Sequence, residues 1–120
     1  MKIQESAEMY LETIHVLQKE LGTVRAVDIA RKMGFSRPSV SVTVHALEDE
    51  GYITIGEDGS IVLLQSGLEI AQRIYERHTV IGEILESIGV NHETAYADAC
   101  KIEHDISPET FACLKSYFKK

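Results

Sequence analysis

Apolar residues recur at three- and four-residue intervals along the first part of the chain. The recurring positions are Ile3, Ala7, Tyr10, Ile14, Leu17 and Leu21. This spacing places them on one face of an α-helix over residues 2–21, and Gly22 is suited to end that helix. A shorter helix is expected at about residues 26–33, because Gly34 interrupts the pattern there.

The segment after this glycine carries the signals of a new helix start. Ser36 offers an N-cap side chain, and Pro38 is tolerated in a first helical turn. The inward stripe of this helix, which reaches about Glu50, is formed by Val40, Val44 and Leu47. We therefore expect two helices joined by a tight turn.

Two β-prone runs follow, YITI at residues 52–55 and SIVLL at residues 60–64. They are separated by GEDG, whose glycines suit the turn of a hairpin. This arrangement predicts a small two-stranded wing that follows the helix pair.

Three further helices are expected in the second half of the chain. Residues 66–88 repeat apolar residues at helical spacing, and Gly89 is placed to stop that helix. Asn91 can cap a helix that runs through His104. The last helix is expected to begin at Ser107 and Pro108.

The fold class predicted from these elements is mainly α-helical. Residues 1–65 are expected to form an N-terminal winged helix-turn-helix DNA-binding domain with a small β-hairpin wing. Residues 66–120 are expected to form a three-helix region.

Composition limits the class of protein. A chain of 120 residues with 44% hydrophobic residues can build one compact domain or two small interlocked units. No stretch approaches the roughly 20 apolar residues that span a bilayer, and the N-terminus lacks the apolar region of a secretory signal. We therefore expect a cytoplasmic protein without a membrane partner. In a reducing compartment Cys100 and Cys113 stay thiols, with ligand or core roles.

The distribution of charge favours a nucleic-acid partner despite an acidic balance. The formal net charge of −7 speaks against a generic nucleic-acid binder. However, residues 29–47 contain no acidic residue, while Arg31, Lys32 and Arg37 supply positive charge there. Acidic residues resume at Glu48. The acid-free window coincides with the predicted helix pair, which favours DNA binding.

The second helix of the pair is the one expected to enter a DNA major groove. Its outer face carries small, hydroxylated and apolar groups that suit close approach to base edges and phosphates. The residues expected at the DNA are Ser36, Arg37, Pro38, Ser39, Ser41, Val42 and Thr43. A winged helix used for protein contacts is the alternative. Catalysis by these hydroxyl groups is not expected, since no GxSxG or SxxK arrangement is present and we expect no enzyme.

The stretch ACKIEH places Cys100, Glu103 and His104 on one face if it is helical. Thiolate, carboxylate and imidazole can share a divalent first-row metal, but three groups on one helix leave its shell incomplete. Met9 lies off the apolar stripe of the first helix and beside glutamates, as a further ligand would. The alternative is a half-buried cysteine with a solvated Glu–His pair, and a methionine that fills a gap.

Five stretches in this order resemble the diphtheria-toxin-repressor family of iron- and manganese-dependent repressors, across essentially the whole chain. They are AEMYLETI (7–14), the helix-turn-helix of residues 24–53, YERHTVIGEIL (75–85), SIGV (87–90) and DACKIEHDIS (98–107). The resemblance implies a homodimeric, metal-activated repressor that binds double-stranded operator DNA through its winged helix. The C-terminal helices would supply ligands and dimer contacts. A short form without the SH3-like domain is expected.

The resemblance also implies ligand positions. Met9, Cys100, Glu103 and His104 match the primary metal positions of the iron-responsive branch, and Glu12 and His78 match positions that ligate a metal in the manganese-responsive branch. Gly82 stands where the family often has a glutamate, and Tyr96 stands where iron-type members have a histidine. A second site at Glu12 and His78 is therefore left open.

The expected metal is a divalent transition metal, with Fe(II) favoured over Mn(II). A thioether and a thiolate are softer ligands than the nitrogen and oxygen set expected of a manganese sensor. The leading hypothesis is a metal-dependent transcriptional regulator that represses metal-uptake genes as a homodimer. The alternatives are a metal-independent winged-helix regulator and, less favoured, a small metalloenzyme or metal carrier.

Overall fold

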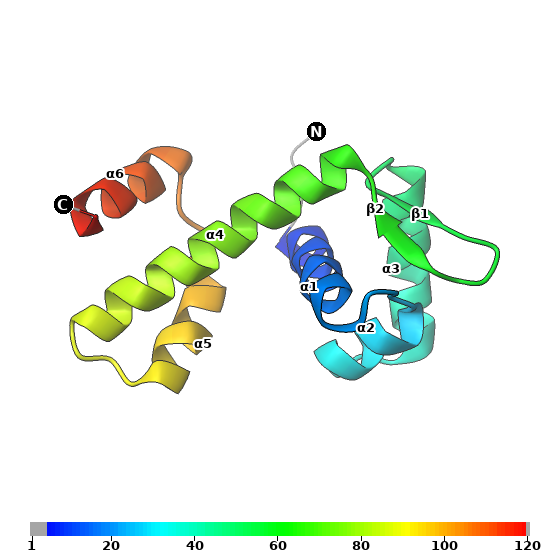
Figure 1. Ribbon diagram of the computed structural model, residues 1–120, viewed down its shortest axis with the longest axis horizontal. Coiled ribbons are helices and arrows are strands. Elements are labelled where there is room, and N and C mark those ends of the chain that lie inside the picture. The colour runs from blue at the N-terminus through cyan, green and yellow to red at the C-terminus, as the bar shows by residue number, and fades with distance from the viewer. Residues whose placement is uncertain (1–4, 120) are drawn as a thin grey trace. The chain divides into compact units, whose positions relative to one another are not determined.

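The computed structural model describes residues 5–119 and divides into two compact units, Met1–Gln72 and Arg73–Lys120. Helices and one β-hairpin follow one another in the predicted order (Figure 1). The mainly helical fold with a winged helix-turn-helix is confirmed. Among the described residues, no helix is both long and apolar enough to cross a membrane. The predicted domain boundary after residue 65 stays a prediction.

Unit 1 contains α1 (Glu5–Leu21), α2 (Ala26–Met33), α3 (Arg37–Asp49), β1 (Ile53–Ile55), β2 (Ile61–Leu63) and the first turns of α4 (Gln65–Ser87). The predicted start of the first helix, at residue 2, lies outside the described residues. Ser36 caps α3 as predicted, since its Oγ accepts a hydrogen bond from the Ser39 N–H at 3.3 Å. Gly34 ends α2 with a φ of 73°, a conformation that glycine adopts without strain.

The two strands form the predicted antiparallel wing. Ile53 pairs with Leu63 and Ile55 with Ile61. The Ile61 N–H also donates to the Val24 carbonyl at 2.7 Å, which joins the hairpin to the segment before α2. The core of unit 1 lies beneath the wing and the three helices, and is built from Tyr10, Leu11, Ile14, Leu17, Val24, Ile29, Ala30, Val40, Val44, Leu47, Ile53, Ile61 and Ala71.

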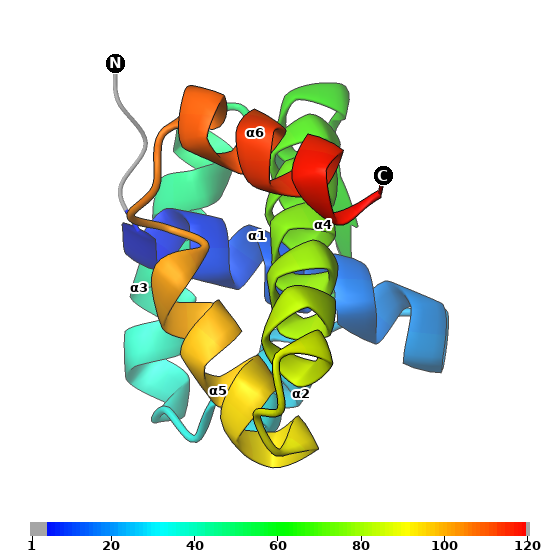
Figure 2. The ribbon, with the colours of Figure 1, turned by 90° about the vertical axis from the view of Figure 1, so that its left-hand side faces the viewer.

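Unit 2 contains the rest of α4, α5 (His92–Ile102) and α6 (Pro108–Phe118), and α5 packs beside α4 (Figure 2). Asn91 caps α5, because its Oδ1 accepts from the N–H groups of Glu93 and Thr94 at 3.0 and 3.3 Å. Ser107 caps α6 in the same way. Val80, Ile81, Ala99 and Phe111 form the small core of this unit.

Helix α5 is shorter than the sequence predicts. It ends at Ile102, two residues before the expected end at His104, and a turn follows. The Asp105 N–H donates to the Ile102 carbonyl at 3.0 Å. This bond spans three residues, whereas the bonds of an α-helix span four, so the chain turns more tightly here than in the helix. Arg77 of α4 binds the carbonyl oxygens of Glu103 and Ile106, so these acceptors are satisfied without a continuing helix.

Candidate metal centre and nucleic-acid interface

Helix α3 has the two faces that its pattern predicts. Val40, Val44 and Leu47 are 0%, 2% and 4% exposed, whereas Val42 is 73% exposed. The helix therefore buries its apolar stripe in unit 1 and leaves an opposite face open to a partner. An exposed valine on that face has no role in the core, and thymine methyl groups are the apolar contacts that a major groove offers.

The predicted DNA-contacting residues lie on or beside this open face. Ser36, Arg37, Pro38, Ser39 and Val42 are exposed, and Ser41 and Thr43 are half-buried. Their contacts with DNA stay a prediction. Within residues 5–119, Arg37 forms no ion pair, whereas Arg31 lies 3.7 Å from Asp28 and Lys32 lies 3.7 Å from Glu20. Of these three cations, Arg37 is the one whose charge no carboxylate offsets.

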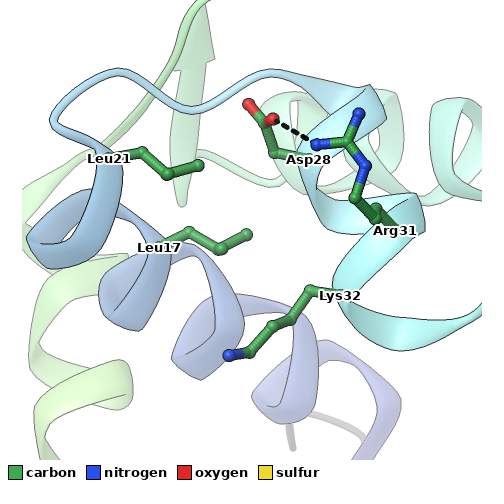
Figure 3. A pocket seen from close by; sticks show the side chains of 5 residues that line it. All are labelled: Leu17, Leu21, Asp28, Arg31 and Lys32. Atoms are coloured by element: carbon green, nitrogen blue, oxygen red, sulfur yellow. Dashed lines mark ion pairs between the residues drawn. The ribbon is translucent and has the colours of Figure 1, made fainter.

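A hollow of about 370 Å³ lies between α1 and α2 of the same unit. Its lining combines two leucines with one carboxylate and two cations (Figure 3): Leu17, Leu21, Asp28, Arg31 and Lys32. The Asp28 carboxylate faces the Arg31 guanidinium, as the dashed line marks. A single carboxylate that is paired with a cation cannot build a metal shell, so the hollow is not the metal centre.

The side chains suited to a metal meet around Glu103 in unit 2. The Glu103 side chain is 0% exposed, although it is a carboxylate. His78 of α4 brings its Nδ1 to 2.9 Å from Glu103 Oε2, within hydrogen-bonding distance. His104, in the turn after α5, brings its Nε2 to 3.4 Å from Glu103 Oε1. One buried carboxylate thus has an imidazole beside each of its oxygens.

Arg77 fixes the backbone on which this carboxylate sits. It is 6% exposed, and its Nη1 donates to the carbonyl oxygens of Glu103 at 3.0 Å and Ile106 at 2.9 Å. Its guanidinium carbon lies 5.5 Å from the centre of the Phe111 ring, which is a cation–π contact. Sequence reasoning missed this residue. The signal was present, because Arg77 lies between Ile74 and Ile81 on the apolar stripe of its helix.

The two departures from the family pattern contact one another. A Cβ atom at Gly82 would lie 2.3 Å from Tyr96 Cε1, so the Tyr96 ring rests on the backbone of α4. The same ring lies 5.3 Å from the His78 ring and 4.8 Å from the His92 ring, centre to centre. Burial, followed by the charges of nearby glutamates, raises the pKa of Tyr96, so its phenol stays neutral at physiological pH.

The remaining predicted ligands are divided between the units. Cys100 is half-buried on α5, one turn before Glu103. Met9 and Glu12 are half-buried on α1 of unit 1. Within unit 2 the structure therefore brings His78, Glu103 and His104 together. The helical spacing of ACKIEH did not indicate that His78 approaches Glu103, because that contact depends on how α4 and α5 pack.

The residues of this cluster fit a divalent metal. Glu103 Oε1 is buried and accepts no hydrogen bond from any of residues 5–119. A buried carboxylate oxygen in that state is costly, and a bound cation removes the cost. Imidazole nitrogens and carboxylate oxygens are the donors that iron, manganese and zinc accept. We conclude that the cluster has the chemistry of a metal site.

Comparison with protein families covers both units. The profile of the iron dependent repressor, N-terminal DNA binding domain, matches residues 2–60. The profile of the iron dependent repressor, metal binding and dimerisation domain, matches residues 64–120. The two profiles follow one another along the chain, in the order that the resemblance predicted.

Individual relatives agree with the profiles. The HTH-type transcriptional regulator MntR of Geobacillus thermodenitrificans is 36% identical over 102 residues, which cover 85% of this chain and 72% of the relative. The transcriptional regulator MntR of Escherichia coli O6:H1 is 32% identical over 117 residues, which cover 98% of this chain and 76% of the relative.

A solved structure also has the same fold. The crystal structure of T. acidophilum IdeR superposes with a TM-score of 0.82 at 26% identity, and the match covers 100% of this chain but only 56% of that one. With both domain profiles matched in order and regulators of transcription among its relatives, the chain belongs to the iron-dependent repressor family of metal-dependent, DNA-binding transcriptional regulators.

Proposed function

We propose that this chain binds operator DNA as a homodimer when a divalent metal occupies the cluster around Glu103, and that it thereby represses metal-uptake genes. The observation that carries the proposal is the buried Glu103 carboxylate with an imidazole beside each oxygen. It lies in the unit that matches a metal-binding and dimerisation domain. The exposed part of α3 before Glu48, which carries no acidic residue, belongs to the other unit.

The ligands that we propose within unit 2 are Glu103, His104, Cys100 and His78. Met9 of α1 is proposed to complete the shell, as the resemblance to the family implies, and Glu12 of α1 is proposed as a further ligand, at the second position that the sequence analysis left open. A metal held by these ligands would cross-link α1 to the helices that carry the Glu103 cluster. A cross-link of this kind favours the chain arrangements in which both groups of ligands can meet, and so changes the population of DNA-binding forms.

The preference for Fe(II) over Mn(II) stays a prediction that rests on the sulfur ligands. His78, Glu103 and His104 offer nitrogen and oxygen donors that accept either metal. The thiolate of Cys100 and the thioether of Met9 are softer, which favours iron. If Cys100 is a ligand, Cys100→Ser replaces a soft ligand with a harder one and shifts the preference toward manganese. The shift is read from the ratio of Fe(II) to Mn(II) needed for half-maximal DNA binding.

The proposed DNA contact uses α3 in a major groove, and dimerisation supplies a second copy of that helix. Arg37→Ala should weaken operator binding by roughly 1 to 3 kcal/mol if the guanidinium reads a base. If it contacts a phosphate, the slope of binding against salt should flatten instead. Because no carboxylate pairs with Arg37 among residues 5–119, the change removes no internal ion pair. Unchanged affinity and an unchanged salt slope would remove Arg37 from the interface.

The test is a binding titration on a DNA duplex recovered with this protein from a random-sequence pool. Affinity is measured by fluorescence anisotropy in chelator, in Mn(II), and in Fe(II) under anaerobic conditions. We expect tight, sequence-specific binding with metal and weak binding in chelator. Glu103→Gln should remove the response to metal, whereas Glu109→Gln, an exposed glutamate on α6, should keep it. Equal binding in chelator and metal would favour a metal-independent regulator and contradict the proposal.

A further inference from the structure

The contact between Gly82 and Tyr96 is too close to be incidental. An alanine Cβ at position 82 would lie 2.3, 2.6 and 2.6 Å from three carbon atoms of the Tyr96 ring. Such distances do not occur between non-bonded atoms, so any side chain at position 82 must displace the ring. Gly82 is also buried within α4, where glycine is unfavourable in the absence of a packing reason. The packing reason is the Tyr96 ring, which occupies the space where a side chain at position 82 would begin.

The Tyr96 ring sits between two imidazoles that differ in their exposure. His92, one turn earlier on α5, is 72% exposed and pairs with Glu86, with Nδ1 2.9 Å from Oε2. His78, one turn before Gly82 on α4, is 27% exposed and is the second imidazole that contacts the Tyr96 ring. The ring therefore separates a surface histidine from the histidine that meets the buried carboxylate.

The Tyr96 ring lies where it limits the motion of His78. Its Nδ1 meets Glu103 Oε2 at 2.9 Å. An imidazole that is more than a quarter exposed can still turn about its side-chain bonds, because solvent replaces the lost contacts. A bulky ring 5.3 Å away, fixed on the glycine backbone, closes off part of that motion.

We propose that Tyr96 is a positioning residue of the metal centre: seated on Gly82, its ring holds the His78 imidazole against Glu103 before metal binds. This inference rests on the proposed function, in which His78 and Glu103 are ligands. Ligands that are held in place before binding lose less side-chain freedom when the metal arrives. Groups that orient metal ligands change metal affinity by 10- to 100-fold when they are removed, and we expect a loss of about tenfold for Tyr96.

Four variants test the assignment, and two of them leave Tyr96 itself in place. Tyr96→Leu removes the ring but keeps an apolar side chain of similar reach. Tyr96→Phe keeps the ring and removes the hydroxyl. Gly82→Ala leaves Tyr96 unchanged and forces its ring away, while raising the helix propensity of α4. His92→Ala removes the outer contact of the ring and serves as the matched control. Circular dichroism checks that each variant is folded.

The first readout is made without metal. Nitrogen-15 NMR of the His78 ring reports its tautomer and its exchange between orientations. Tyr96→Leu and Gly82→Ala should both give averaged His78 signals, whereas Tyr96→Phe and His92→Ala should keep the wild-type signals. Unchanged His78 signals in Tyr96→Leu and in Gly82→Ala would overturn the proposal. Since this measurement needs no metal, it stands apart from a failure of the metal-dependent function.

The second readout is the affinity for Co(II) alone, followed by its visible absorption under anaerobic conditions. Tyr96→Leu and Gly82→Ala should each weaken Co(II) binding about tenfold. The double variant should bind Co(II) no more weakly than either single variant, because both changes remove the same contact between the Tyr96 ring and His78. Tyr96→Phe should bind like the wild type. If Tyr96→Phe loses as much affinity as Tyr96→Leu, the hydroxyl itself acts on the metal and the positioning role is wrong. If wild-type protein binds no Co(II), it is the proposed function that fails.

Discussion

Replacing Arg77 with methionine tests whether the buried guanidinium holds the turn that carries Glu103 and His104. Methionine has a similar length and is apolar, so the change removes the charge and the donors while filling most of the space. In the folded protein it would leave the carbonyl oxygens of Glu103 and Ile106 without the Arg77 donor. The neighbouring residue Glu76 provides a control on the same helix, since it pairs with Lys115 at 2.6 Å.

The size of the effect follows from the contacts. Each hydrogen bond to a charged group contributes roughly 1.5 to 3 kcal/mol, and Arg77 makes two to buried or partly buried carbonyls. Removal of the guanidinium also removes a cost, because Arg77 Nε is buried and donates to no acceptor within residues 5–119. An unsatisfied buried donor costs roughly 1 to 3 kcal/mol. We therefore expect Arg77→Met to lower the free energy of unfolding by about 3 kcal/mol.

The assay is urea unfolding followed by circular dichroism at one fixed protein concentration, because association changes apparent stability. Glu76→Gln should cost less than about 1 kcal/mol, since its pair with Lys115 is 47% and 37% exposed. Equal losses for Arg77→Met and Glu76→Gln would contradict the predicted role of Arg77. They would mean that the buried hydrogen bonds of Arg77 contribute no more than a solvated ion pair.

Further predictions address the DNA-binding unit. Val44→Ala should lower the free energy of unfolding by about 2 kcal/mol because two methyl groups leave the core, whereas Val42→Ala should change it by less than about 0.5 kcal/mol and instead weaken operator binding. The opposite pattern would mean that the faces of α3 are assigned wrongly. Burial, and then the charge of Lys19, lower the pKa of His15 below its usual 6.5. A lowered histidine pKa means that folding opposes protonation, so the free energy of unfolding should fall as pH drops through about 6.5. In urea titrations at pH 7.5 and 5.5, this fall should be smaller for His15→Gln than for the wild type. Equal pH dependence in both proteins would contradict this.

Helix α3 could be predicted from sequence because the signals that define it are local. A stripe at helical spacing needs only the period of the helix, and Val40, Val44 and Leu47 are indeed buried. The start of the helix was equally local, since Ser36 and Pro38 act within one turn of the chain. Such features do not depend on which other elements pack nearby.

The arrangement of the candidate metal centre could be predicted only in part. Helical spacing grouped Glu103 with His104, although the helix ends before His104. The approach of His78 to Glu103 depends on the packing of α4 against α5, which no local pattern specifies. The same holds for the Tyr96 ring on Gly82, where a residue without a side chain is explained by a ring fourteen positions later.

The proposed function makes metal at the Glu103 cluster and operator DNA linked ligands of one protein. Linkage is reciprocal, so DNA must tighten metal binding by the same factor by which metal tightens DNA binding. The measurement is a calorimetric titration of Mn(II) into the protein with and without its operator duplex. We predict an affinity gain of roughly 5- to 150-fold with DNA, the range of a typical allosteric coupling, and none in Glu103→Gln. The same Mn(II) affinity with and without operator would contradict the proposed function.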